Sequence, residues 1–137
     1  MRISDIMTHE VETITPDQSI AEAARAMLKS DCGSLFVRDN DKLVGVITDR
    51  DIVIRCVAKD LPCDTPVSQI MTDAILYCFE DEDIQHVAEN MADLHVRRLP
   101  VMNRNKRLVG IVSLGNFASG ANVNAGSTLL RGVAQAH

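Results

Sequence analysis

The chain has 137 residues, of which 46% are hydrophobic and 24% charged, and 14 Lys and Arg against 19 Asp and Glu give a net charge of −5. This composition excludes an intrinsically disordered chain, and the length fits one modest globular unit or two very small ones. The acidic balance argues against a large nucleic-acid-binding surface, since phosphate contacts need clustered Lys and Arg.

No apolar run approaches the ~20 residues needed to span a bilayer. The first residues, Met1–Asp5, lack the apolar stretch of a signal peptide. We therefore expect a soluble, cytoplasmic protein with no membrane partner.

A motif is repeated along most of the chain. Ile3–Thr8 (ISDIMT) returns as Val67–Thr72 (VSQIMT), and Leu43–Ile47 (LVGVI) returns as Leu108–Val112 (LVGIV). We accordingly divide the chain into a first repeat (1–58), a linker (59–66), a second repeat (67–118) and a flexible carboxy-terminal tail (119–137) with a helical turn near Leu129.

In the first repeat, a short strand at Val11–Thr13 precedes a helix opened by a capping box of Ser19 and Glu22 and ended by Gly33. Helical spacing gives this helix an apolar face of five residues: Ile20, Ala23, Ala24, Met27 and Leu28. A hairpin of Leu35–Val37 and Leu43–Ile47 and a helix over Asp49–Ala58 follow.

The second repeat gives the same order of elements: a strand at Ile75–Tyr77, a helix over Asp83–Leu94, a hairpin around Asn103–Lys106 and a short helix near Gly115. Pro100 lacks a backbone donor and predicts an edge strand. The predicted fold class is α+β, with two β-α-β-β-α repeats packed with pseudo-twofold symmetry, because neither repeat alone closes more than a marginal core. Such packing would create two clefts lined by both repeats, which are candidate ligand sites.

Thr48-Asp49-Arg50-Asp51 follows a predicted strand and opens a helix. One interpretation is a helix capping box and nothing more. The other is a ligand site, because a helix amino terminus attracts phosphate and a carboxylate there can accept both hydrogen bonds of a ribose diol.

The matching residues of the second repeat are Ser113-Leu114-Gly115-Asn116. Asn116 is uncharged and accepts through one oxygen, so its hold on a diol should be weaker than that of Asp51. The two clefts should therefore differ.

Arg97 and Arg98 enter a predicted strand, so their side chains should point to opposite sides, and one could bind a phosphate. The alternative is that both are solvated surface residues. Gly33 and Ser34 take their places in the first repeat, which again makes the clefts unequal.

Taken together, Asp-Ile-Met-Thr at 5–8 with its second copy Gln-Ile-Met-Thr at 69–72, the run from Leu43 to Ile52 and His95–Val101 resemble a tandem pair of cystathionine β-synthase-type (CBS) domains, also called a Bateman module. The resemblance covers residues 1 to about 118. It implies binding of an adenosine-containing regulatory ligand such as AMP, ADP or ATP, in some members NAD or S-adenosylmethionine, and assembly into a homodimer.

The resemblance also implies two sets of ligand-binding residues. The stronger set is Val46, Thr48, Asp51, Ile75, Leu76, Arg97 and Arg98. The weaker set is Glu12, Gly33, Ser34, Ile111, Ser113 and Asn116. Asp51 would hold the ribose, Thr48 and the arginines the phosphates, and the apolar side chains the adenine; in the weaker set Asn116 departs from the usual Asp.

The sequence thus predicts a stand-alone adenine-nucleotide sensor that acts in trans on an unidentified protein partner. The alternative is a ligand-free structural or oligomerisation module. We predict no enzymatic activity and no catalytic residues, because the chain has no Gly-x-Ser-x-Gly elbow, P-loop or His-Glu-x-x-His. Neither the four cysteines, Cys32, Cys56, Cys63 and Cys78, nor the four histidines, His9, His86, His95 and His137, show a zinc-ligand spacing. We therefore predict no metal site and interpret the cysteines as buried or incidental thiols.

Overall fold

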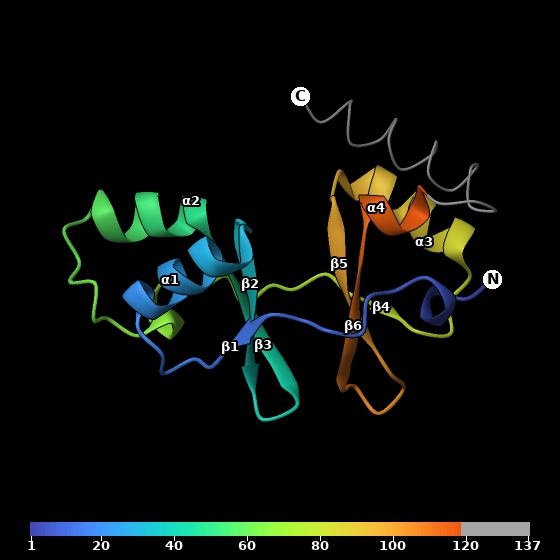
Figure 1. Ribbon diagram of the computed structural model, residues 1–137, viewed down its shortest axis with the longest axis horizontal. Helices are drawn as coiled ribbons and strands as arrows, with labels where there is room; N and C mark the ends of the chain where they lie inside the picture. Colours follow the sequence, from blue (N-terminus) through green and yellow to red (C-terminus); the bar gives the residue numbers. More distant parts are fainter. Residues whose placement is uncertain (119–137) are drawn as a thin grey trace. The chain divides into compact units, whose positions relative to one another are not determined.

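The computed structural model describes residues 1–118, which form two compact units (Figure 1). The central unit is Glu12–Ile75, and the split unit joins Met1–Val11 to the chain from Leu76 onward. The predicted flexible tail, 119–137, and its helical turn lie outside the described residues. Within the described part, no helix is long and apolar enough to cross a membrane.

The central unit holds a three-stranded sheet in the order β1-β2-β3, with β1 parallel and β3 antiparallel to β2. Its helices gather on one face of the sheet (Figure 1). The elements are β1 (Thr13–Ile14), α1 (Ile20–Ser30), β2 (Ser34–Asp39), β3 (Lys42–Thr48), α2 (Asp49–Asp51), a π-helical continuation (Ile52–Val57) and a 3-10 turn (Val67–Gln69).

The split unit repeats this topology with a sheet in the order β4-β5-β6. Its elements are a 3-10 turn (Ile3–Asp5), β4 (Cys78–Phe79), α3 (Ile84–Leu94), β5 (Arg98–Met102), β6 (Leu108–Ser113) and α4 (Leu114–Phe117). The predicted α+β class with two β-α-β-β-α repeats is confirmed. The strands β1 and β4 begin two to three residues later than predicted.

The compact units and the sequence repeats differ in where the opening segments pack. Ile3 is fully buried in the core of the split unit, and its N–H donates to the Glu82 carbonyl at 2.9 Å. In the same way Val67 is fully buried in the central unit and donates to the Gln18 carbonyl at 2.8 Å. Each opening segment therefore completes the core of the unit that contains the helices and hairpin of the other repeat.

Helix α1 departs from its prediction at two points. It ends at Asp31, which adopts the left-handed conformation (φ 51°) and bonds back to Leu28 and Met27, so Gly33 is not the stop. Its buried residues are Ile20, Ala23 and Met27, whereas Ala24 is exposed and Leu28 is 82% exposed. The buried stripe of α1 is therefore narrower than the apolar spacing suggested. In α3, Ala88 and Ala92 take the places of Ala24 and Leu28, and both are buried.

The prediction that Pro100 marks an edge strand is wrong, because β5 is the middle strand of its sheet. Pro100 lies opposite Ile111, whose N–H and C=O both bond to Thr8 on the other side. The missing donor of Pro100 therefore faces the β4 side, where the ladder begins only at Cys78. No ladder hydrogen bond is lost at this position.

Cys78 gives the fold a testable alkaline response. Burial, with a smaller contribution from Glu82, raises the pKa of the Cys78 thiol to about 12. An unfolded thiol ionises near its ordinary value, so the folded chain holds this proton more tightly and stability falls as pH rises from about 9 towards 12. At pH 10 the loss should be about 1.4 kcal/mol. Chemical denaturation at pH 7.5 and pH 10 measures the unfolding free energy of the wild type and of Cys78→Ala. The difference between the two proteins should be smaller at pH 10 by that amount. An unchanged difference would contradict the raised pKa of Cys78.

Candidate functional site

The Thr48–Asp51 turn forms the capping box predicted from the sequence. The Thr48 N–H donates to Asp51 Oδ2 at 3.0 Å, and the Asp51 N–H donates to Thr48 Oγ1 at 3.0 Å. These reciprocal bonds satisfy two backbone donors at the start of α2. The capping role is therefore real, and it fixes the Asp51 carboxylate at the amino terminus of a helical segment that continues to Val57.

Capping leaves part of the Asp51 carboxylate available. An ionised carboxylate has about four lone-pair sites, and the capping bond uses one on Oδ2. Oδ1 lies 3.8 Å from Nε of Arg55, and the Asp51 side chain is 15% exposed. The carboxylate is thus sheltered but still able to accept hydrogen bonds from a polyhydroxyl ligand.

The sequence interpretation missed Arg55. This side chain pairs with Asp51 one helical turn away and donates from Nη1 to the Ile70 carbonyl at 3.1 Å. Arg55 thereby connects the capping residue to the second Ile-Met-Thr segment. The spacing of Asp51 and Arg55 at i and i+4 could have indicated the pair.

Other predicted residues of the central unit meet the same turn. Ser34 lies opposite Thr48 in the β2–β3 ladder, and the Gly33 carbonyl accepts from the Asp49 N–H at 2.9 Å. A Cβ at Gly33 would lie 3.0 Å from Asp49 Oδ2, so the turn is closely packed there. Val46 pairs with Thr72 through two backbone bonds of 2.9 Å.

Asn116 takes a different set of partners in the split unit. Its Oδ1 accepts from the Ser113 N–H at 2.8 Å and from Ser113 Oγ at 2.9 Å. Its Nδ2 donates to the Ile6 carbonyl at 2.8 Å and reaches Thr8 Oγ1 at 3.3 Å. Both lone pairs of the oxygen and both N–H groups are therefore engaged by the protein.

Arg97 and Arg98 lie beside this second turn within the split unit. Arg98 is opposite Ser113 in the β5–β6 ladder, and the Arg97 carbonyl accepts from the Leu114 N–H at 3.0 Å. Both side chains are exposed. The arginines occupy the ladder positions that Gly33 and Ser34 occupy in the central unit.

The structure thus divides each predicted set between the two units. Of the stronger set, the central unit holds Val46, Thr48, Asp51 and Ile75, and the split unit holds Leu76, Arg97 and Arg98. Of the weaker set, the central unit holds Glu12, Gly33 and Ser34, and the split unit holds Ile111, Ser113 and Asn116. Joint action of residues from the two units remains a prediction. Among residues 1–118, no group of three or more His, Cys, Asp and Glu side chains is placed to hold a metal ion.

Comparison with known proteins places this geometry in a family. The family model of the CBS domain matches residues 3–57 and 67–120. The chain is 37% identical over 129 residues to the CBS domain-containing protein YhcV of Bacillus subtilis, covering 93% of this chain and 91% of that protein.

Two solved structures share the fold. The CBS domain pair of protein MJ0100, in complex with 5'-methylthioadenosine and S-adenosyl-L-methionine, is 31% identical, with a TM-score of 0.72 over 86% of this chain and 93% of that one. The CBS domain protein PAE2072 from Pyrobaculum aerophilum, complexed with AMP, is 26% identical, with a TM-score of 0.72 over 98% of this chain and 99% of that one. The chain therefore belongs to the CBS domain family and carries two copies of the domain.

Proposed function

We propose that this chain is a regulatory module that binds an adenosine-containing ligand. The observation that carries the proposal is that two structures with this fold, MJ0100 and PAE2072, hold adenosine compounds. The ligand class is AMP, ADP, ATP or NAD, with S-adenosylmethionine as a further member. The ligand acts as a regulator and not as a catalytic cofactor.

Asp51 is the residue we assign to the ribose. Its carboxylate is fixed by the capping bond and keeps acceptor capacity on Oδ1. A ribose diol offers two O–H donors, and a carboxylate can accept both. Thr48 and the helix amino terminus beside it would favour the phosphate.

Asn116 is assigned to the weaker set because its polar atoms are already engaged. A ribose hydroxyl could bind Asn116 only by displacing a bond to Ser113, Ile6 or Thr8. Breaking a buried or half-buried hydrogen bond costs about as much as the new bond returns. Binding at the second set should therefore be weaker.

Regulation further requires that the ligand favour one of two arrangements of the protein. A ligand shifts a conformational equilibrium only by its difference in affinity for the two states. We propose that the module works as a homodimer, has no enzymatic activity of its own and transmits this shift to a protein partner.

The proposal is tested by a ligand panel on ligand-stripped, full-length protein. AMP, ADP, ATP, NAD, NADH and S-adenosylmethionine are compared by thermal shift and titration calorimetry, with GMP as the matched purine control. A ligand at a hundred times its Kd adds about 2.7 kcal/mol of stability, which raises Tm by several degrees. Absence of heat and of any shift with every adenosine compound would leave the ligand-free structural module as the better description.

Arg98→Ala should weaken phosphate-bearing ligands selectively. Loss of a charge-assisted contact should reduce AMP affinity roughly tenfold and leave adenosine affinity nearly unchanged. Calorimetry with AMP and adenosine on Arg98→Ala and on Arg38→Ala, a half-buried arginine outside both predicted sets, measures this selectivity. Equal weakening of AMP and adenosine would remove the phosphate role of Arg98.

A further inference from the structure

Two cysteines of the central unit, Cys56 and Cys63, flank the turn that follows its π-helical segment. Cys56 is 1% exposed, and its Sγ donates to the Leu61 carbonyl at 3.4 Å. The Leu61 N–H returns a bond to the Cys56 carbonyl at 3.0 Å. Asp60, in the left-handed conformation (φ 56°), makes the reversal between them.

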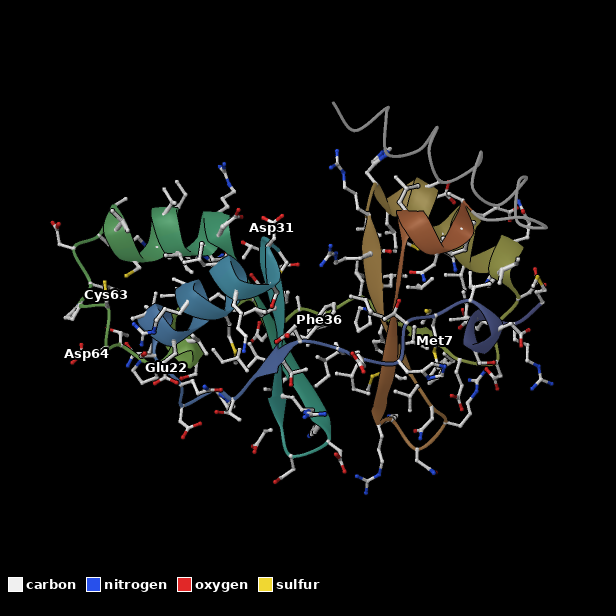
Figure 2. The ribbon with its side chains drawn as sticks, in the orientation of Figure 1. Met7, Glu22, Asp31, Phe36, Cys63 and Asp64 are labelled. Carbon is white, nitrogen blue, oxygen red and sulfur yellow. The ribbon has the colours of Figure 1, made fainter. Side chains whose placement is uncertain are left out.

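The second thiol follows two residues after Leu61. Cys63 is exposed and lies on the loop that follows the helical segment (Figure 2). Its carbonyl accepts from the Ala21 N–H at 2.9 Å, so its backbone is fixed at the start of α1. The two bonds between Leu61 and Cys56 return the chain to the Cys56 thiol two residues before Cys63. Burial raises the pKa of the Cys56 thiol, and interaction with the Cys63 thiol raises it further.

We propose that Cys56 and Cys63 form a reversible disulfide when the protein meets hydrogen peroxide or a related hydroperoxide. The proposal is independent of the adenosine ligand. It assigns different roles to the two thiols: Cys63 is the exposed thiol that reacts with peroxide, and Cys56 is the sheltered thiol that resolves the product.

The chemistry balances with peroxide as the oxidant. The Cys63 sulfur attacks one peroxide oxygen, the O–O bond breaks, and Cys63 becomes a sulfenic acid while the departing hydroxide takes up the thiol proton as water. The Cys56 sulfur then attacks the Cys63 sulfur, the S–S bond forms and the S–O bond breaks. Hydroxide leaves with the Cys56 proton as the second water. Two thiols are oxidised, and one peroxide is reduced to two waters.

The bridge would join two parts of the central unit. Cys56 belongs to the helical segment that begins at Asp49, and Cys63 holds the amino terminus of α1 through its carbonyl. A closed loop of this kind lowers the entropy of the unfolded chain. Oxidation should therefore raise Tm by roughly 5 °C.

The test treats full-length, reduced protein with one equivalent of hydrogen peroxide, alkylates remaining thiols under denaturing conditions and maps the peptides. The expected product is lighter by about 2 Da, carries the Cys56–Cys63 link and leaves Cys32 and Cys78 alkylated; a dithiol restores the original mass. A link between any other cysteines, or a Cys63 sulfinic acid beside an alkylated Cys56, would overturn the proposal.

Three variants separate the roles of the thiols. Cys56→Ser should leave a Cys63 sulfenic acid that dimedone traps, and in Cys63→Ser the sheltered Cys56 thiol should stay reduced. Cys32→Ser, which changes a half-buried thiol of the same unit, should form the bridge as the wild type does. The peptide map of the wild type decides the proposal even where a variant folds poorly, and oxidation of Cys56 in Cys63→Ser would contradict it.

Discussion

Asp51→Ala should abolish most of the binding of adenosine-containing ligands while the protein stays folded. Hydrogen bonds to a charged group contribute about 1.5–3 kcal/mol each, so loss of one such bond to ribose lowers affinity by roughly ten- to a hundredfold, and loss of two by up to about ten thousandfold. Titration calorimetry with the tightest ligand of the panel measures the loss.

The capping role of Asp51 must be separated from this effect. Asp51→Ala removes the acceptor of the Thr48 N–H, which should itself cost about 1 kcal/mol of folding stability. Asp51→Asn keeps an acceptor for that bond and loses the charge, so it should restore stability more than affinity. If folding stability and ligand affinity recover to the same extent in Asp51→Asn, Asp51 only caps the helix.

Asn116→Ala is the matched variant in the second repeat. Because the polar atoms of Asn116 bind Ser113, Ile6 and Thr8, this change should lower Tm and alter ligand affinity less than Asp51→Ala does. An equal or larger loss of affinity at Asn116 would reverse the ranking of the two sets.

The repeated sequence carries enough information to predict the two sheets. The paired apolar runs around Asp39–Lys42 and Asn103–Lys106 give both hairpins, because alternating apolar segments and turn residues are local signals. The Thr48–Asp51 capping box is equally local, since its residues are three apart.

What the sequence does not predict depends on contacts between distant segments. Ile3, from the first repeat, packs in the split unit, and Val67, from the second repeat, packs in the central unit. The sequence does not predict this exchange, because the two hairpins have nearly the same pattern and either could receive either segment. The exposure of Leu28 depends on how far the sheet extends over α1. The engagement of Asn116 by Ile6 follows from the same exchange and has no local signal.

The glycine shared by the two Leu-Val-Gly motifs has a packing role. A Cβ at Gly110 would lie 2.8 Å from the Thr8 carbonyl oxygen and 2.8 Å from Met7 Sδ (Met7 is labelled in Figure 2). Met7 is 9% exposed, and Thr8 forms two backbone bonds of 2.9 Å with Ile111, the next residue of β6. Absence of a side chain at Gly110 therefore allows the opening segment to lie directly against β6.

Gly110→Ala should destabilise the fold by about 1–3 kcal/mol, because Thr8 can move away from the new methyl group only by breaking its bonds to Ile111. Gly45→Ala should cost less: the nearest atom there is the flexible Met71 Sδ at 2.5 Å, and the backbone oxygen of Thr72 lies 3.1 Å away. Gly115→Ala is the control, since its nearest neighbour is 3.9 Å away and alanine favours a helix. Chemical denaturation of the three variants should rank them Gly110, Gly45, Gly115 in decreasing loss; a Gly110 variant as stable as the Gly115 variant would mean that the opening segment does not lie against β6.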